Sequence, residues 1–284
     1  MQNRIFICVL LICSATLSSP SQSMQKEWRT PKLDDLVYMQ TQHGLVIIEL
    51  APFMAPNHVS QFKKLVSQGF YNGLDFYRVI DGFVAQGGDV DGINKGFDVK
   101  PLNAEFSRVA PKTSSFQLEQ NNDLMAPQTG YLHGFSAGRD QDGNQEWLLH
   151  CPGTVAMARG NEKNSATSDF YIVIGQATRH LDRNMSSFGK VIYGMPAVQA
   201  VTRASVNTPS GMLEAQQRSK IEWVKLASEV ELKDRINVQI QHQDSVQVKQ
   251  RLDGARKLQN PFFHYKGNGN LDMCYYQLKT RVLE

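Results

Sequence analysis

The sequence predicts a mainly β domain, followed by a C-terminal extension that contains a helix. Short apolar runs of strand type are separated by glycine turns, as at residues 37–42 and 45–50 on either side of Gly44. Residues 55–70 instead repeat apolar side chains at helical spacing, and a further helical stripe follows residue 231. With 284 residues and 41% hydrophobic content, the chain is long enough for one large domain or for one domain with appendages.

Residues 73–89, GLDFYRVIDGFVAQGGD, are the stretch around which this domain is organised. Their apolar residues are of strand type, and the Asp81-Gly82 pair predicts a turn between two strands. Arg78 and Gln86 are the polar exceptions and lie eight residues apart. A turn between them still allows both side chains to point into one pocket.

The other elements follow in order along the chain. Pro56 suits the first turn of a helix and Gly69 ends the apolar repeat, so one helix is expected over residues 55–70. Residues 154–157 and 170–174 predict strands, and a short helix is expected to begin at Pro196. The alternating pattern of residues 221–226 predicts a strand that closes the sheet.

Three blocks of this sequence resemble one known family. The segment FYRVIDGFVAQGGD resembles the signature of the cyclophilins, the prolyl cis/trans isomerases, and especially of their bacterial members. Residues 152–175, PGTVAMARGNEKNSATSDFYIVIG, and residues 188–195, FGKVIYGM, are similar to the second half of the same domain. The resemblance implies a closed eight-stranded cyclophilin-like β-barrel capped by two helices. It also implies an enzyme that acts on proline-containing polypeptides without cofactor or metal.

The chemistry of this reaction requires few groups. Rotation about a peptide bond faces a barrier of roughly 18–20 kcal/mol, and no covalent bond has to break. A catalyst must hold the proline ring in an apolar pocket and stabilise the twisted amide with a cationic donor, for which a guanidinium is well suited. By resemblance, Arg78 matches the catalytic arginine and Gln86 matches the neighbouring glutamine that contacts the substrate backbone. The remaining positions that match substrate-binding positions are Phe83, Val84, Ala158, Arg159, Asp169, Tyr171, His180, Leu181 and Met185.

Several of these positions depart from the family's usual residues. Val84 replaces a common methionine and Tyr171 a usual phenylalanine. Asp169 stands where a glutamine is usual, and Met185 where eukaryotic members have a histidine. We therefore expect a carboxylate that competes with substrate for the guanidinium, and a phenolic hydroxyl that makes the proline site more polar. His180, where many members have tryptophan or phenylalanine, is expected at the rim of the pocket.

The N-terminus predicts export. Residues 1–23 contain an early arginine, then the apolar run IFICVLLIC, then small and polar residues, which is the layout of a secretory signal peptide. The apolar run is too short to span a bilayer. The alternative is an N-terminal strand that is buried or frayed. We expect a periplasmic or secreted protein with no membrane insertion after the signal is removed.

The remaining chain divides into a cyclophilin-like domain, residues 24–230, and a C-terminal extension, residues 231–284. Within the domain, residues 92–150 form an insertion that is rich in proline and glycine and is expected to fold over the barrel as a surface elaboration. The extension predicts a docked helix, with the alternative of a surface for a protein partner. Its helical stripe and its apolar patch consist of Val246, Leu252, Ala255 and Leu258, and of residues 261–265, PFFHY.

Charge and cysteine content limit the possible partners and ligands. The chain has 30 basic and 27 acidic residues without a basic cluster, which disfavours nucleic acid and anionic membranes as partners. Cys151 and Cys274 remain after removal of the signal segment, and the sequence leaves their pairing open. A local group of oxygen donors does not match the spacing of a calcium-binding loop, so a solvated turn and no metal site are expected there. This group consists of Asp140, Asp142, Asn144 and Glu146.

Two functions remain open at this point. The first is a peptidyl-prolyl cis/trans isomerase that assists the folding of exported proteins, which Arg78 and Gln86 favour. The second is a polypeptide-binding or assembly factor with weak or no isomerase activity, whose insertion and extension are the working surfaces. Asp169, Tyr171 and Met185 favour this second function.

Overall fold

The computed structural model describes residues 27–176 and 178–283, so the predicted signal segment lies outside the described residues. Eight antiparallel strands close a barrel in the order β11-β12-β5-β4-β14-β2-β3-β13, which confirms the predicted fold class. The barrel strands are β2 (Leu36–Thr41), β3 (Gly44–Leu50), β4 (Asp75–Ile80), β5 (Val84–Gly88), β11 (Thr154–Met157), β12 (Phe170–Val173), β13 (Ser187–Tyr193) and β14 (Ser219–Leu226). The predicted closing strand is β14, which pairs with both β2 and β4.

Two helices cap the barrel, as predicted. Helix α1 (Pro56–Ser67) has its proline in the first turn and buries Phe62 against Phe170 and Phe188 of the barrel. Helix α2 (Met195–Gln199) begins one residue earlier than predicted, after Gly194 in the left-handed conformation. A Cβ on Gly194 would lie 1.9 Å from the Leu45 carbonyl oxygen, so only glycine fits this helix start. Short 3-10 helices are η1 (Leu33–Asp35), η2 (Arg179–Leu181), η3 (Ala215–Gln217), η4 (Ala227–Glu229) and η5 (Leu232–Asp234).

The hairpin of β4 and β5 forms around the predicted turn. Gly82 adopts a positive φ of 67°, which closes the turn that Asp81 begins. In the resulting register Arg78 lies directly opposite Gln86. The turn therefore brings both polar side chains to one place on the barrel surface.

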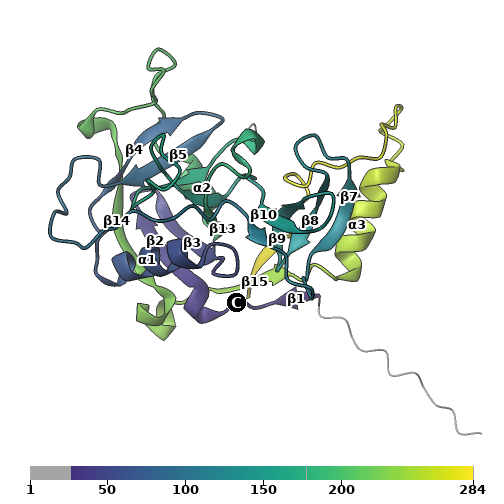
Figure 1. Ribbon diagram of the computed structural model, residues 1–284, viewed down its shortest axis with the longest axis horizontal. Helices are drawn as coiled ribbons and strands as arrows, with labels where there is room; N and C mark the ends of the chain where they lie inside the picture. The colour runs from purple at the N-terminus through teal and green to yellow at the C-terminus, as the bar shows by residue number, and fades with distance from the viewer. Residues whose placement is uncertain (1–26, 177, 284) are drawn as a thin grey trace, which may run out of the picture.

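A second lobe stands beside the barrel and contains most of the insertion and the extension (Figure 1). The insertion forms a five-stranded antiparallel sheet in the order β6-β10-β9-β8-β7, and β15 pairs with β1 and β16 in a three-stranded sheet. These strands are β6 (Arg108–Val109), β7 (Gln117–Asn121), β8 (Gln128–Leu132), β9 (Phe135–Arg139), β10 (Gln145–Leu148), β1 (Trp28–Arg29), β15 (Asn237–Gln241) and β16 (Thr280–Leu283). Figure 1 shows α3 (Val246–Lys257) beside β7 of this lobe.

The insertion is more than the surface elaboration that the sequence predicts, because it supplies a second core. Tyr131 and Trp147 of the insertion are buried together with Leu252 and Met273 of the extension. The outward faces of β2 and β3 close this second core from the barrel side, through side chains such as Tyr38. Insertion and extension therefore depend on each other and on the barrel for burial of apolar surface.

The predicted helix of the extension is docked, with a shifted apolar stripe. Val248 and Leu252 are buried on α3, whereas Val246 is 44% exposed. The side chain of Ser245 accepts a hydrogen bond from the Val248 amide and thereby caps the helix N-terminus. The apolar patch of residues 261–265 stays exposed through Phe262 and Tyr265.

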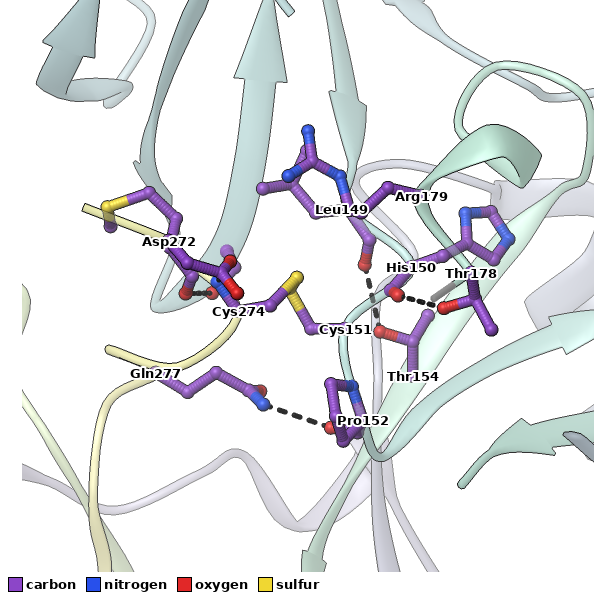
Figure 2. Close-up of a disulfide and its surroundings, with 12 residues drawn as sticks. Leu149, His150, Cys151, Pro152, Thr154, Thr178, Arg179, Asp272, Cys274 and Gln277 are labelled. Carbon is purple, nitrogen blue, oxygen red and sulfur yellow. Dashed lines mark hydrogen bonds between the residues drawn. A yellow bond between two sulfur atoms is a disulfide. The ribbon is translucent and has the colours of Figure 1, made fainter. Parts of the chain in front are cut away.

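The pairing of the two remaining cysteines is settled by the structure. Cys151, just before β11, forms a disulfide with Cys274 in the tail that follows α3 (Figure 2). Beside it, Gln277 Nε2 donates a hydrogen bond of 3.0 Å to the Pro152 carbonyl. The tail is thus fastened to the barrel at one covalent and one polar contact.

Candidate active site

One cavity of about 360 Å³ brings together most of the predicted site residues. The hairpin of β4 and β5 supplies one wall and β12 supplies the floor. The segment after β11, η2 and the segment between η2 and β13 supply the rest. All of the predicted residues except Asp169 and His180 line it. The lining consists of Arg78, Phe83, Val84, Gln86, Ala158, Arg159, Tyr171, Leu181 and Met185.

The floor of this cavity is apolar. Val84 and Tyr171 are buried, and the partly buried Phe83, Leu181 and Met185 pack against the same small cluster. A floor of aliphatic and aromatic carbon suits a pyrrolidine ring, which has no hydrogen-bond donor of its own.

Arg78 is the cation at the edge of this floor. Its Nε donates a hydrogen bond of 2.8 Å to the Ser210 carbonyl, and its Nη1 donates one of 3.2 Å to Gln86 Oε1. Within the described part of the chain, no carboxylate lies within ion-pair distance of this guanidinium. The side chain is therefore held in place while its positive charge remains available to a substrate.

Asp169 does not contact Arg78, in contrast to the competition that the sequence predicts. Its Oδ2 accepts a hydrogen bond of 2.7 Å from the Tyr77 hydroxyl, and its Oδ1 accepts one from the Asp89 amide. A Cβ on Gly88 would lie 2.1 Å from this carboxylate, so glycine makes room for it. Burial raises the pKa of Asp169 above its ordinary value.

Tyr77 connects this carboxylate to the catalytic pair. Gln86 Nε2 donates a hydrogen bond to the Tyr77 hydroxyl, while Gln86 Oε1 accepts from Arg78. The donors therefore run in one direction, from Arg78 through Gln86 and Tyr77 to Asp169. This chain fixes which way the Gln86 amide faces, with its oxygen toward the guanidinium.

The Tyr171 hydroxyl is also turned away from the cavity, so the proline site is less polar than predicted. Its oxygen lies 2.9 Å from Nε2 of the buried His150, and His150 Nδ1 lies 3.1 Å from Asp182 Oδ1. Burial raises the pKa of Tyr171 well above its ordinary value, which keeps the phenol protonated. Of this side chain, the aromatic ring is therefore what forms part of the cavity floor.

His180, expected at the rim, does not itself line this cavity but lies next to Phe83, which does. It is exposed, and its ring stacks on Phe83 with centroids 5.7 Å apart and planes 8° from parallel. Arg159 uses its guanidinium for backbone carbonyls, with Nε and Nη2 donating to Asn184 at 3.1 and 3.0 Å. Its role visible here is to hold the cavity wall in shape.

Sequence reasoning missed three residues that shape this site, namely Tyr77, His150 and Asp182. Each is buried and is hydrogen-bonded to a predicted site residue or to its partner. A buried tyrosine needs a partner for its hydroxyl, so the position of Tyr77 next to Arg78 could have predicted a hydrogen bond near the site. His150 and Asp182 lie in different segments and carried no comparable local signal.

Among the described residues, no group of three or more His, Cys, Asp or Glu side chains is arranged to hold a metal ion. Asp140 instead binds the Asn144 amide at 2.7 Å inside the β9–β10 turn. Glu146 is not in a solvated turn as predicted, because it is buried and paired with Arg108 at 2.9 Å. Across residues 27–176 and 178–283, no helix has the length and apolar character needed to cross a membrane.

A closed antiparallel barrel with a fixed, uncompensated arginine beside an apolar cavity defines the class of prolyl isomerases with the cyclophilin fold. Residues 36–225 match the family described as cyclophilin type peptidyl-prolyl cis-trans isomerase/CLD. The chain belongs to this family, and it is a peptidyl-prolyl cis-trans isomerase.

Individual proteins agree with this assignment. The chain is 33% identical over 174 residues to a probable peptidyl-prolyl cis-trans isomerase of Brucella suis, covering 61% of this chain and 74% of the relative. It is 28% identical over 194 residues to peptidyl-prolyl cis-trans isomerase A of Dickeya dadantii, covering 68% and 78%. The crystal structure of cyclophilin AquaCyp293 from Hirschia baltica is similar with a TM-score of 0.74 and 30% identity, covering 90% of this chain and 93% of that one. This last similarity extends beyond the barrel.

Proposed function

We propose that this isomerase acts on polypeptides that fold outside the cytoplasm, and that Arg78 is the residue that accelerates the rotation. The observation that carries the assignment of Arg78 is its fixed guanidinium without a carboxylate partner among the described residues, at the edge of an apolar cavity. As the prolyl amide twists, it loses resonance and its nitrogen becomes more basic. A fixed cation with free donors stabilises that state more than it stabilises the planar amide.

Gln86 complements this role. Its carbonyl is committed to Arg78 and one amide hydrogen is committed to Tyr77. The second amide hydrogen remains to donate to a carbonyl of the substrate backbone. Substrate position and catalytic charge are thereby coupled through a single side chain.

The test is the isomerisation rate of a short peptide with one X-Pro bond. Arg78→Ala should lower kcat/KM by at least about tenfold, which corresponds to ~1.4 kcal/mol of transition-state stabilisation. Arg78→Lys should recover little, because one ammonium does not reproduce the planar donor array. Full activity in Arg78→Ala would remove the proposed mechanism.

The chain offers a matched control for this substitution. Arg281 also lies opposite a glutamine on a paired strand and donates to its Oε1, here Gln239 at 2.7 Å. Arg281→Ala removes the same kind of pair in the separate sheet of β1, β15 and β16, outside the cavity lining, and should keep the wild-type rate. Wild-type protein with no rate above the uncatalysed exchange would instead favour the polypeptide-binding factor.

Action on exported proteins is supported by two independent features. The first 23 residues follow the order of a secretory signal peptide, and Cys151 is paired with Cys274, as is common in oxidising compartments. We therefore propose a periplasmic or secreted protein. N-terminal sequencing of protein from its native host should begin near residue 24, and thiol labelling should find both cysteines blocked. Retention of residues 1–23 on a soluble cytoplasmic product would contradict this location.

A further inference from the structure

A second cavity, of about 540 Å³, adjoins the site and is built from three segments that are distant in the sequence. The insertion contributes residues 122–125, the barrel contributes residues of η2, and the tail of the extension contributes residues 270–272. The single helical turn η2 divides the two cavities. Leu181 lines the proline cavity, whereas Arg179 and His180 line the second one.

A bound polypeptide can reach from one cavity into the other. The ring of His180, which lines the second cavity, stacks on Phe83, which lines the first, with 5.7 Å between the centroids. An extended chain advances ~3.3 Å per residue. A side chain two or three residues away from the proline therefore extends past His180.

The second cavity offers apolar surface beside amide groups. Leu124 is 94% exposed and Met125 is 44% exposed at its insertion wall. Asn122, Gln176 and Asn270 add side-chain amides around them. Exposed apolar side chains next to amides suit one apolar side chain of a polypeptide together with its neighbouring peptide groups.

The charges inside this cavity are largely compensated. Arg179 binds Asp123 at 2.8 Å and Asp182 at 2.5 Å, and all three side chains are mostly buried. Asp272 is exposed, and its Oδ1 accepts a hydrogen bond from the Cys274 amide. The cavity therefore suits a neutral polypeptide segment better than a charged one.

The walls are fixed relative to one another before any ligand binds. Asp123, held by Arg179 of the barrel, also accepts a hydrogen bond of 3.0 Å from the Met125 amide. The Leu271 amide of the tail donates to Gln120 Oε1 of the insertion at 2.5 Å. The disulfide at Cys274 then ties the tail to the barrel close to Arg179 (Figure 2). Such preorganisation reduces the entropy lost when a flexible peptide binds.

We propose that this cavity is a substrate subsite for an apolar side chain located two or three residues from the isomerised proline, on one side of it. The proposal rests on the isomerase function and names a preference within its substrates. The insertion and the extension would then select among proline-containing polypeptides, while the barrel performs the rotation.

A series of peptides tests this subsite. Each peptide has the same X-Pro bond in a glycine and serine background, with one leucine placed in turn at the positions from four before to four after the proline. In wild-type protein, leucine at one position two or three residues from proline should raise kcat/KM by about tenfold over serine, equivalent to ~1.4 kcal/mol. The gain should appear in KM, since this remote contact is the same in the ground state and the transition state.

Two variants separate the subsite from general effects. Leu124→Ser should reduce the leucine-to-serine ratio of kcat/KM at that position to about one third of its wild-type value or less. Leu232→Ser, at a leucine that is 81% exposed on η5, should keep the wild-type ratio. Both side chains are exposed, so neither substitution removes core packing. A flat peptide series in active wild-type protein, or an unchanged ratio in Leu124→Ser, would overturn the proposal.

A binding measurement distinguishes failure of the subsite from failure of the isomerase. If the serine reference peptide is not isomerised, the proposed function fails, and the subsite is then judged from backbone amide chemical shifts. Titration with the favourable leucine peptide should shift the amides of Leu124 and Asn270 more than titration with the serine peptide does. Equal shifts for both peptides would refute the subsite regardless of turnover.

Discussion

Replacing Cys151 and Cys274 together with alanine removes the covalent link between the barrel and the tail. Both cysteines are buried, so alanine is preferred to serine because it adds no buried hydroxyl. The two residues are separated by 123 positions. In the loop-entropy model, a closed loop of that length constrains the unfolded chain by about 16 cal/mol/K, or about 5 kcal/mol at 25 °C.

That figure is a ceiling for the loss of unfolding free energy, and losses of about 2–5 kcal/mol are the measured norm for native disulfides. Urea unfolding should be followed by two probes, because each probe reports a different part of the molecule. The three tryptophans belong to the second lobe or border its core: Trp147 is buried in it, Trp223 packs against it and Trp28 is on β1. Fluorescence therefore reports the second lobe, whereas far-UV circular dichroism reports the barrel as well.

Reduction of the disulfide in the wild-type protein provides the controls. Reduced wild-type protein should unfold at nearly the same urea concentration as the double variant, and reductant should leave the double variant unchanged. Equal stability of the oxidised wild type and the double variant would show that noncovalent packing alone fastens the tail. The entropic argument from loop length would then be wrong for this chain.

Three other predictions concern buried polar groups. Tyr77→Phe should lower the unfolding free energy by about 1–3 kcal/mol in urea titrations and reduce kcat/KM, because Asp169 loses a donor and Gln86 loses its anchor; unchanged kinetics would exclude a positioning role. His150→Leu and Tyr171→Phe should each lower the unfolding free energy. The loss in the double variant should be smaller than the sum of the two single losses by about 0.5–3 kcal/mol. Additive losses would contradict the coupling of these two side chains. Burial lowers the pKa of Lys190 from its ordinary 10.5 to about 8, so wild-type stability should rise as the pH rises from about 8 to 10.5. Lys190→Met should therefore unfold with a free energy up to about 3 kcal/mol larger than that of the wild type at pH 7. Thermal melts should show this advantage disappearing between about pH 8 and pH 10.5. An advantage that persists at pH 10.5 would refute the lowered pKa of Lys190.

The first helix and the meeting of Arg78 with Gln86 were predictable because their signals are local, whereas the closed eight-stranded barrel was implied by the resemblance of three sequence blocks to the cyclophilins. One turn at Asp81 and Gly82 sets the register of β4 and β5, and the helical repeat of α1 is continuous. The five-stranded sheet of the insertion was not predictable in the same way. Strands such as β8, QTGYL, and β9, FSAGR, are short, contain glycine and lack clear alternation, so their pairing depends on contacts made after the chain has folded.

One sequence signal for the second lobe was nevertheless present in β3. Its residues 45–50, LVIIEL, are apolar at nearly every position instead of at alternate ones. Val46 and Ile48 face the barrel core, whereas Ile47 faces the second core. A strand of this kind has both faces buried, which requires that something outside the barrel cover it.

The departures from the family's usual residues at the site are explained by partners that lie far away in the sequence. Asp169 is matched by the Tyr77 hydroxyl, and the Tyr171 hydroxyl is matched by His150 at the end of the insertion. Left without partners, these buried polar groups would each cost about 1–3 kcal/mol. With partners, they point away from the substrate and leave an aromatic face and a free guanidinium at the cavity. The polar substitutions therefore alter how the proline site is supported, and through His150 they make the shape of its floor depend on the insertion.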